Sequence, residues 1–198
     1  MAGQAGFKSP SAWTGCISSC QMNESADSYT PIKLQERFRA QAVRVWMIAA
    51  AAVLIWVGLI ITTPLFLANG LSSISSPLYS FFGYICHQIP ERSLHLAEHQ
   101  MAVCTRCFGV YAGLAAGLLV YPLWRTLDEV EAIPPVWLFL SLLPVGIDWT
   151  LTIFGIWENT HFSRFVTGGI LGAVCATYIV PALVEVTRNI SSQRPKPQ

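Results

Sequence analysis

The chain has 198 residues, of which 53% are hydrophobic and only 12% are charged, and its formal net charge is +1. Soluble globular proteins carry about 25% charged residues, so this composition excludes an ordinary soluble domain and indicates an integral membrane protein. The basic residues form no run along the chain, which disfavours a nucleic-acid-binding function and predicts no nucleic acid partner.

Four apolar segments are long enough to cross a lipid bilayer. The first one contains no Lys, Arg, Asp or Glu, and it would span a hydrocarbon core about 30 Å thick. The predicted spans are residues 45–68, 105–124, 136–157 and 164–184. Residues 77–84 are aromatic but too short to cross. We therefore predict an all-α fold, an integral membrane bundle of about four transmembrane helices plus a short interfacial or re-entrant helix.

The predicted membrane domain covers residues 41–188. Residues 1–40 contain scattered Gly, Ser, Pro and polar residues and are expected to form a disordered tail, as are residues 189–198. The spacing of Cys16 and Cys20 in the first tail suggests a metal or redox pair, but no His lies nearby, and we interpret them as free thiols. The first apolar segment begins too far into the chain for a signal peptide, so we expect it to be retained.

The distribution of basic residues predicts the orientation in the membrane. An even number of spans places both termini on one side, and most basic residues lie there: Lys33, Arg37, Arg39, Arg44, Arg125, Arg188, Arg194 and Lys196. The opposite side carries Arg92, Arg106 and Arg164. The positive-inside rule therefore predicts cytoplasmic termini. We expect a multi-pass protein of the bacterial inner (plasma) membrane, with the loop over residues 90–103 on the extracytoplasmic side.

Cysteine and histidine gather directly before the second predicted span. Cys86 and His87 are adjacent, and Cys104 and Cys107 form a Cys-x-x-Cys motif where residues i and i+3 share one helix face. Thiolate and imidazole are ligands that zinc prefers, and two ligand pairs separated by a loop can close a tetrahedral site. A helix N-terminus also lowers the pKa of a thiol, which suits metal binding and thiol redox chemistry alike.

These residues allow more than one interpretation. The first is a zinc site whose ligands are Cys86, His87, Cys104 and Cys107. In an oxidising compartment, two of the three cysteines could instead form a disulfide that cross-links the loop. His95 and His99 are four residues apart with Glu98 between them, and we interpret them as part of a solvated loop rather than as further ligands.

Small residues recur at every fourth position in the second and fourth predicted spans. The two stripes are Gly109, Gly113 and Gly117 in one span and Gly168, Gly172 and Ala176 in the other. Such stripes let two helix backbones approach closely in lipid. We therefore predict that these two spans are in contact, and homodimerisation through one stripe is the alternative.

One acidic residue, Asp148, lies within the third predicted span. An acid in a bilayer costs several kcal/mol unless it is paired or hydrated, so Asp148 is expected to face the bundle interior. Its candidate partners are Arg106, Arg164 or a metal, and the alternative is a protonated carboxyl bonded to helix backbone. The last loop adds polar residues on the side of the cysteines: Glu158, Asn159, His161 and Arg164. We therefore predict one composite site at that membrane surface.

The segments "CHQIPERS", "CTRCFGVYAG" and "RFVTGG", together with Asp148, resemble a family of bacterial and archaeal membrane proteins, Domain of Unknown Function 2085, over about residues 75–175. The family pattern corresponds to Cys86, His87, Gln88, Pro90, Glu91, Arg92, Ser93, Cys104, Arg106, Cys107, Gly109, Tyr111, Gly113, Asp148, Arg164, Thr167 and Gly168. Two positions depart from it, because Thr152 stands where Gln is expected and His161 where Asn is expected. The resemblance supports the site but implies no particular reaction.

The residues together favour a metal-dependent membrane enzyme, with zinc as cofactor, that acts on a lipid or another anionic membrane substrate. Asp148 or Glu91 would be the general base, and Arg106 with Arg164 would bind the anionic group. Further substrate-binding candidates are Arg92, Gln88, His161, Thr167 and Tyr111. Two alternatives stay open: a thiol-disulfide redox protein in which Cys104 and Cys107 cycle and Cys86 resolves, and a non-catalytic membrane assembly or transport component.

Overall fold

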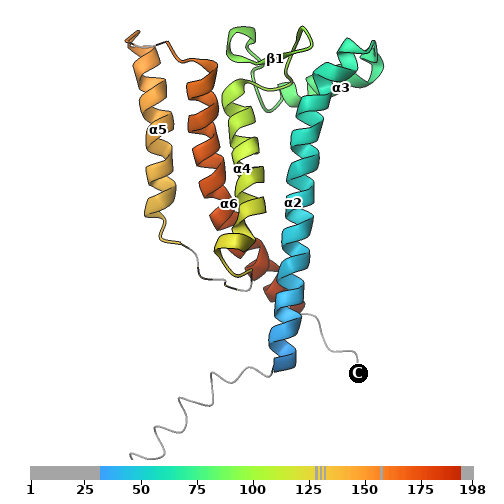
Figure 1. Ribbon diagram of the computed structural model, residues 1–198, viewed down its shortest axis with the longest axis vertical. Helices are drawn as coiled ribbons and strands as arrows, with labels where there is room; N and C mark the ends of the chain where they lie inside the picture. The colour runs from blue at the N-terminus through green and yellow to red at the C-terminus, as the bar shows by residue number, and fades with distance from the viewer. Residues whose placement is uncertain (1–31, 128, 130, 132, 157, 193–198) are drawn as a thin grey trace, which may run out of the picture. The chain divides into compact units, whose positions relative to one another are not determined.

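The computed structural model describes residues 32–127, 129, 131, 133–156 and 158–192. Along the chain the elements are α2 (Ile32–Ala68), α3 (Ser72–Gly83), η1 (Pro90–Arg92), β1 (His95–Leu96), β2 (His99–Gln100), α4 (Thr105–Trp124), α5 (Val136–Ile153) and α6 (His161–Ser192) (Figure 1). By its internal contacts the chain divides into Met1–Arg37 and Phe38–Gln198. The arrangement described below is that of the second unit.

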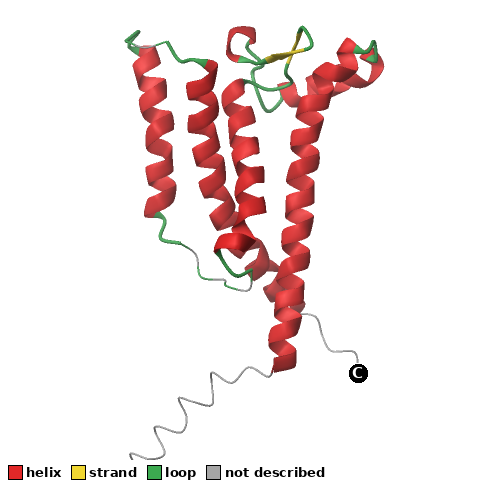
Figure 2. Ribbon diagram, viewed as in Figure 1, coloured by secondary structure: helices red, strands yellow, loops and turns green. Residues whose placement is uncertain are grey.

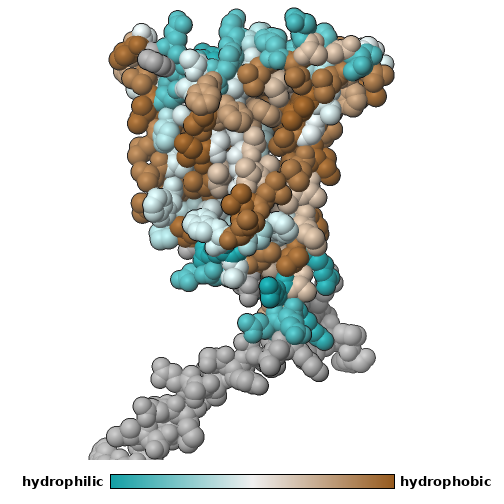
Figure 3. Space-filling model, viewed as in Figure 1, coloured by the Kyte–Doolittle hydropathy of each residue, from teal (hydrophilic) through white to brown (hydrophobic). Residues whose placement is uncertain are grey.

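Among the described residues, four helices are long and apolar enough to cross a membrane: Gln35–Ala68, Thr105–Trp124, Val136–Ile153 and His161–Ser191. Large apolar side chains on them are exposed, for example Ile48, Phe139 and Ile147, and such a surface is compatible with lipid rather than with water. Hydrophobic residues cover the sides of the helices and hydrophilic residues gather at their ends (Figure 3). The predicted all-α membrane bundle is confirmed.

Helices α4 and α6 lie side by side with their backbones in direct contact (Figure 1). A Cβ atom at Gly113 would lie 2.1 Å from the backbone oxygen of Gly169, and one at Gly172 would lie 2.0 Å from that of Val110. No side chain larger than hydrogen fits at these positions, as expected of small-residue packing in lipid. The predicted contact between the second and fourth spans is therefore correct, and the two stripes pack against each other within a single chain.

Aromatic side chains attach α2 to its neighbours. The indole Nε1 of Trp46 donates a 2.7 Å hydrogen bond to the carbonyl oxygen of Leu118 in α4. Trp56 makes edge-to-face contacts with Phe82 of α3 and Tyr111 of α4, at ring centroid separations of 5.5 and 5.9 Å, a geometry that aromatic pairs prefer. These contacts hold the end of α3 close to the beginning of α4.

The helix α3 is the short additional helix that the sequence predicts over residues 77–84, although it begins earlier, at Ser72. It is followed by the loop that carries η1 and a two-stranded hairpin, which holds all the strand structure of the described residues (Figure 2). His95 pairs with Gln100, and Leu96 pairs with His99. His95 is exposed, as the interpretation of a solvated loop requires, whereas His99 is half-buried.

Several helix ends differ from the predicted boundaries. Residues 32–40 are helical, although we expected them to belong to a disordered tail. Helix α6 also continues beyond residue 188, to Ser192. Once a helix has formed in the membrane, good helix formers extend it into the headgroup region at little cost in free energy. The third span ends at Ile153 because Gly155 has a positive φ of 66°, a helix-terminating conformation. The interpretations of residues 1–31, including Cys16 and Cys20, and of residues 193–198 lie outside the described residues.

Candidate metal centre and adjoining cleft

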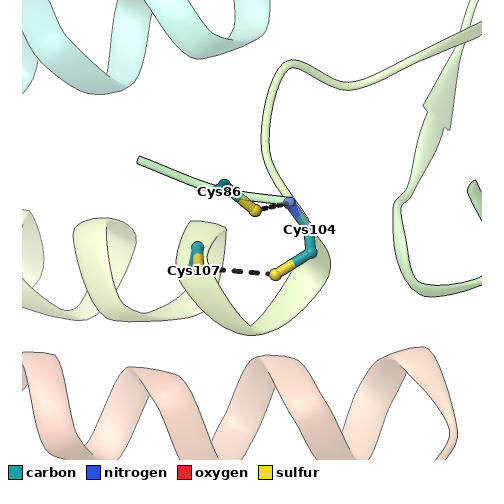
Figure 4. Close-up of side chains that lie close together, drawn as sticks. All are labelled: Cys86, Cys104 and Cys107. Carbon is teal, nitrogen blue, oxygen red and sulfur yellow. Dashed lines mark hydrogen bonds between the residues drawn. The ribbon is translucent and has the colours of Figure 1, made fainter. Parts of the chain in front are cut away.

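Three cysteines from two segments meet at the start of α4 (Figure 4). The sulfur atoms of Cys86, Cys104 and Cys107 all lie within 4.8 Å of one another, and those of Cys104 and Cys107 are 3.4 Å apart. Zinc with Zn–S distances near 2.3 Å places tetrahedral sulfur ligands about 3.8 Å apart. The cluster therefore fits three zinc ligands with small shifts of the side chains, and all three cysteines are free thiols.

A set of hydrogen bonds positions Cys86 against α4. The backbone N–H of Cys104 donates to the sulfur of Cys86 over 3.2 Å, as outer-shell donors commonly do to a metal-ligating thiolate. Gln88 adopts a left-handed backbone conformation, with φ of 48°. Its side-chain Nε2 donates to the carbonyl oxygens of Tyr79 and Ala102, both at 2.8 Å. Gln88 thereby connects α3 to the segment that leads into α4 and fixes the chain on both sides of the cluster.

The Cys104 thiol is acidified by its surroundings. A side-chain hydrogen bond with Cys107 lowers the pKa of Cys104 to about 5, against the opposing effect of burial. Further hydrogen bonds with Cys86 and with the backbone of Cys107 and Arg106 lower the pKa in the same direction. These hydrogen bonds favour the thiolate of Cys104, the form required both of a metal ligand and of a redox-active cysteine.

Asp148 of α5 is the centre of a polar network that includes Arg106, which lies between Cys104 and Cys107 in the chain. Its side chain is 9% exposed and forms an ion pair with Arg106 of α4. It also accepts hydrogen bonds from the hydroxyl of Ser163 in α6 and, over 2.8 Å, from Nδ2 of Asn159. Of the partners that the sequence suggests, Arg106 is therefore the one that pairs with Asp148, and the network connects three membrane helices.

A cleft of about 260 Å³ lies beside the three cysteines. Its polar lining consists of His87, Gln88, Arg92, Arg106, Thr152, Asn159 and Arg164 together with the cysteines, and its apolar lining consists of Ile85, Ile89, Trp149 and Ile153. Two buried polar atoms of this lining, Nε of Arg106 and Oδ1 of Asn159, have no hydrogen-bond partner in the described structure. Buried polar atoms are usually satisfied, so these two would gain a partner if a small shift of the side chains opened them to the cleft.

Most of the predicted site residues meet at this cleft, but five are outside its lining, and one of them, Asp148, is connected to the cleft through its ion pair with Arg106. Tyr111 contacts Trp56 in the helix packing, and the hydroxyl of Thr167 donates to the carbonyl oxygen of Ser163 in its own helix. Glu91 is exposed on η1. His161 begins α6 and is outside the cleft lining. His87 lies at the cleft, but it is exposed and outside the group of close ligand atoms.

The structure also adds a buried residue that the sequence reasoning missed. The hydroxyl of Thr105 donates to the carbonyl oxygen of Arg92 and lies 3.0 Å from Nδ1 of His161. Because a hydroxyl has a single proton, Nδ1 of His161 must be the donor to Thr105. Thr105 thus connects η1, α4 and α6. Sequence reasoning also missed Ser163, whose hydroxyl donates a hydrogen bond to Asp148. An acid within a span requires nearby hydrogen-bond donors, so the serine directly before Arg164 was a recognisable candidate.

These features define a multi-pass α-helical membrane protein with a three-cysteine cluster at one end of its bundle. More particularly, the chain belongs to the family described as predicted membrane protein (DUF2085), whose model matches residues 86–178, which confirms the resemblance seen in the sequence. An uncharacterised protein of Methanocaldococcus jannaschii is 41% identical over 114 residues, which cover 57% of this chain and 72% of that protein. An uncharacterised protein of Methanothermobacter thermautotrophicus is 35% identical over 89 residues, 44% of this chain and 77% of that protein. No solved structure matches.

Proposed function

We propose that this protein is a metal-dependent membrane enzyme whose zinc ion is held by Cys86, Cys104 and Cys107. The observation that carries the proposal is the approach of three sulfur atoms to within 4.8 Å of one another beside a cleft. Three protein ligands leave a fourth tetrahedral position, as in catalytic zinc sites. His87, which adjoins Cys86 and lines the cleft, is our candidate for a fourth ligand, and its engagement would make the centre structural.

The cleft supports an anionic substrate. Arg92, Arg106 and Arg164 line it, and guanidinium groups bind carboxylate or phosphate through paired, charge-assisted hydrogen bonds. Zinc at an open site supplies Lewis-acid polarisation of a phosphoryl or acyl oxygen. We assign Asp148 the role of orienting Arg106, because its carboxylate already accepts three side-chain contacts. The exposed Glu91, next to Arg92 on η1, is our candidate general base.

We further propose that the cysteine end of the bundle faces the extracytoplasmic side of a plasma membrane and that both termini are cytoplasmic. The support is the excess of basic residues at the opposite ends of the spans, among them Arg39, Arg44 and Arg125. Both relatives are archaeal proteins, so the proposal concerns the plasma membrane in general. Labelling of Cys86, Cys104 or Cys107 by a membrane-impermeant thiol reagent in intact cells, after metal chelation, tests this orientation.

Metal analysis of the detergent-purified protein tests the zinc proposal. We expect about one zinc per chain in the wild type, loss of the metal in Cys104→Ser, and retention of the metal in Cys175→Ser. Cys175 lies on α6 outside the cluster and is the matched control. Thiols counted under denaturing conditions should be equal before and after reduction. Zinc that persists in Cys104→Ser would contradict the assignment of Cys104 as a ligand.

A second candidate function, thiol-disulfide exchange, is favoured by the close approach of Cys104 and Cys107 and by the low pKa of Cys104. A reactive Cys-x-x-Cys at a helix N-terminus is typical of disulfide oxidoreductases. In this case Cys86 would resolve mixed disulfides. The same experiment separates the two functions, because redox chemistry predicts no stoichiometric metal and two thiols per chain that become countable only after reduction.

A further inference from the structure

Two of the arginines at the cleft have no acidic partner in the part of the chain that the structure describes. Within the described residues the ion pairs are Arg106 with Asp148 and Arg125 with Glu129. Arg92 and Arg164 belong to neither pair, and Nη1 of Arg164 only approaches the carbonyl oxygen of Glu91, at 3.5 Å. Two guanidinium groups that line one cleft repel each other, and an anion bound between them would offset this repulsion.

The third arginine is held in a fixed orientation. Asp148 binds the Nη2 atom of Arg106, while the Nε atom is buried and has no hydrogen-bond partner among the described residues. Asn159 donates to the same carboxylate through Nδ2, which leaves its buried Oδ1 as an unused acceptor. Arg106 and Asn159 are therefore held in place at the lining of the cleft, together with two arginines that have no acidic partner among the described residues. A phosphate group supplies acceptor oxygens for the arginines.

One wall of the cleft belongs to the lipid-facing surface of the protein. Trp149 and Ile153 of α5 line the cleft, and they are 58% and 59% exposed on a helix that spans the membrane. A phosphate dissolved in water gains nothing from this apolar wall, whereas the acyl chain of a lipid does. The cleft volume of about 260 Å³ is below the range of about 300–1,000 Å³ typical of whole drug-sized ligands, which suits a headgroup rather than an entire lipid.

We propose that the cleft binds the phosphate headgroup of a membrane lipid, with Arg92, Arg106 and Arg164 on the phosphate and the acyl chain along Trp149 and Ile153. This inference rests on the proposed function, because it names the substrate class of the same site. The phosphate lies beside the three cysteines that line the same cleft.

Binding measurements on the full chain in detergent, by calorimetry or native mass spectrometry, test this proposal with three probes. The probes are dioctanoyl phosphatidic acid, dioctanoylglycerol and inorganic phosphate. We expect one phosphatidic acid per chain, bound at least about tenfold more tightly than either other probe, since charge-assisted hydrogen bonds and apolar burial each contribute this much. Equal affinity for dioctanoylglycerol would overturn the phosphate assignment, and equal affinity for inorganic phosphate would overturn the lipid assignment.

Substitutions in the cleft test which side chains contact the phosphate and which contact the acyl chain. Arg164→Gln and Arg92→Gln should each weaken phosphatidic acid binding about tenfold, and Arg164→Lys should weaken it less because it retains the charge. Trp149→Ala should weaken phosphatidic acid binding and leave inorganic phosphate unchanged. Arg44→Gln, an exposed position of α2, is the matched control with wild-type binding. An unchanged affinity in both cleft arginine variants would overturn the proposal.

Zinc measured on the same samples separates this inference from the proposed function. Zinc without phosphatidic acid binding in the wild type would overturn the lipid assignment and leave the metal centre supported. Phosphatidic acid binding without zinc would support the lipid site and contradict the metal-dependent enzyme. The arginine variants should retain the wild-type zinc content, which also shows that they are folded.

Discussion

Two regions of the molecule hold its helices together in different ways. One is the interface between α4 and α6, and the other is the polar network at the cysteine end, which also includes α5. Along the interface, glycines such as Gly113 and Gly172 bring the two backbones into contact. At the cysteine end, Asp148 connects α5 to α4 and α6 through an ion pair and two hydrogen bonds. The first region depends on shape and the second on the pairing of charge.

The difference matters because lipid chains are as apolar as the helices they surround. Burying apolar surface therefore contributes little to helix association in a bilayer, and close packing and polar contacts contribute instead. The helix α4 uses both means, whereas on α5 only Ser141 and Asp148 are buried. We infer that α5 depends mainly on the polar network and that α4 and α6 would stay together without it. The predictions below test this contrast.

The largest effect is expected for Gly113→Leu. Its side chain would meet the backbone of Gly169 at 2.1 Å, and backbone cannot move aside as a flexible side chain can, so the cost should be at least about 3 kcal/mol. We expect loss of the folded monomer in detergent, measured by size-exclusion chromatography and thermal unfolding. Gly146→Leu is the control, because a Cβ atom at Gly146 would meet no atom within 4 Å apart from its chain neighbours and the adjacent backbone of its own helix. Similar behaviour of the two variants would contradict the packing by shape.

The next effect is expected for Asp148→Ala. It leaves the guanidinium of Arg106 without its counter-charge in a largely buried position, which should reduce the free energy of unfolding by about 3 kcal/mol. Thermal unfolding of the purified variant measures the loss. The double variant Asp148→Leu with Arg106→Met should recover much of it, because two apolar side chains leave no unpaired charge. A double variant as unstable as Asp148→Ala would show that the pair acts through something other than its charge.

A smaller effect is expected for Ser163→Ala, which removes one of the donors to Asp148. The ion pair and the bond from Asn159 stay in place, so the loss should be about 1 kcal/mol. Ser80→Ala provides the comparison, because the Ser80 hydroxyl is exposed and bonds only within α3. Equal melting temperatures for the two variants would mean that Ser163 does not support the network.

A change of pH is expected to affect the fold least, but it should change the reactivity of the Cys104 thiol clearly. A thiol reacts as its thiolate, and the Cys104 pKa of about 5 means that its alkylation in metal-free protein should rise up to about pH 5 and level off above it. An unperturbed cysteine would still gain reactivity up to about pH 8.5. Mass spectrometry of the Cys104 peptide after brief iodoacetamide treatment gives this profile. Cys107→Ala removes the first cause of the shift, so its midpoint should move upward, and an unmoved midpoint would contradict that cause.

The sequence was sufficient for those features that depend on local pattern. Uncharged apolar segments identify the spans because the bilayer core excludes charge, and the repeat of small residues along two of them predicts which helices touch. The Cys-x-x-Cys motif predicts a pair of neighbouring thiols, since residues three apart share a helix face. Asp148 was recognisable as a buried, paired group because a bilayer does not tolerate an isolated charge.

Only the tertiary structure decided how these parts meet, because the contacts concerned join residues far apart in the chain. It brought Cys86 to Cys104 through Gln88, and it selected Arg106 over Arg164 as the partner of Asp148. It also left Arg92 and Arg164 without acidic partners among the described residues, at the same cleft as the cysteines. Composition and spacing determined that this protein spans a membrane and holds reactive groups at one surface. The packing of α4 against α6 and the loop before α4 determined which of those groups share a site.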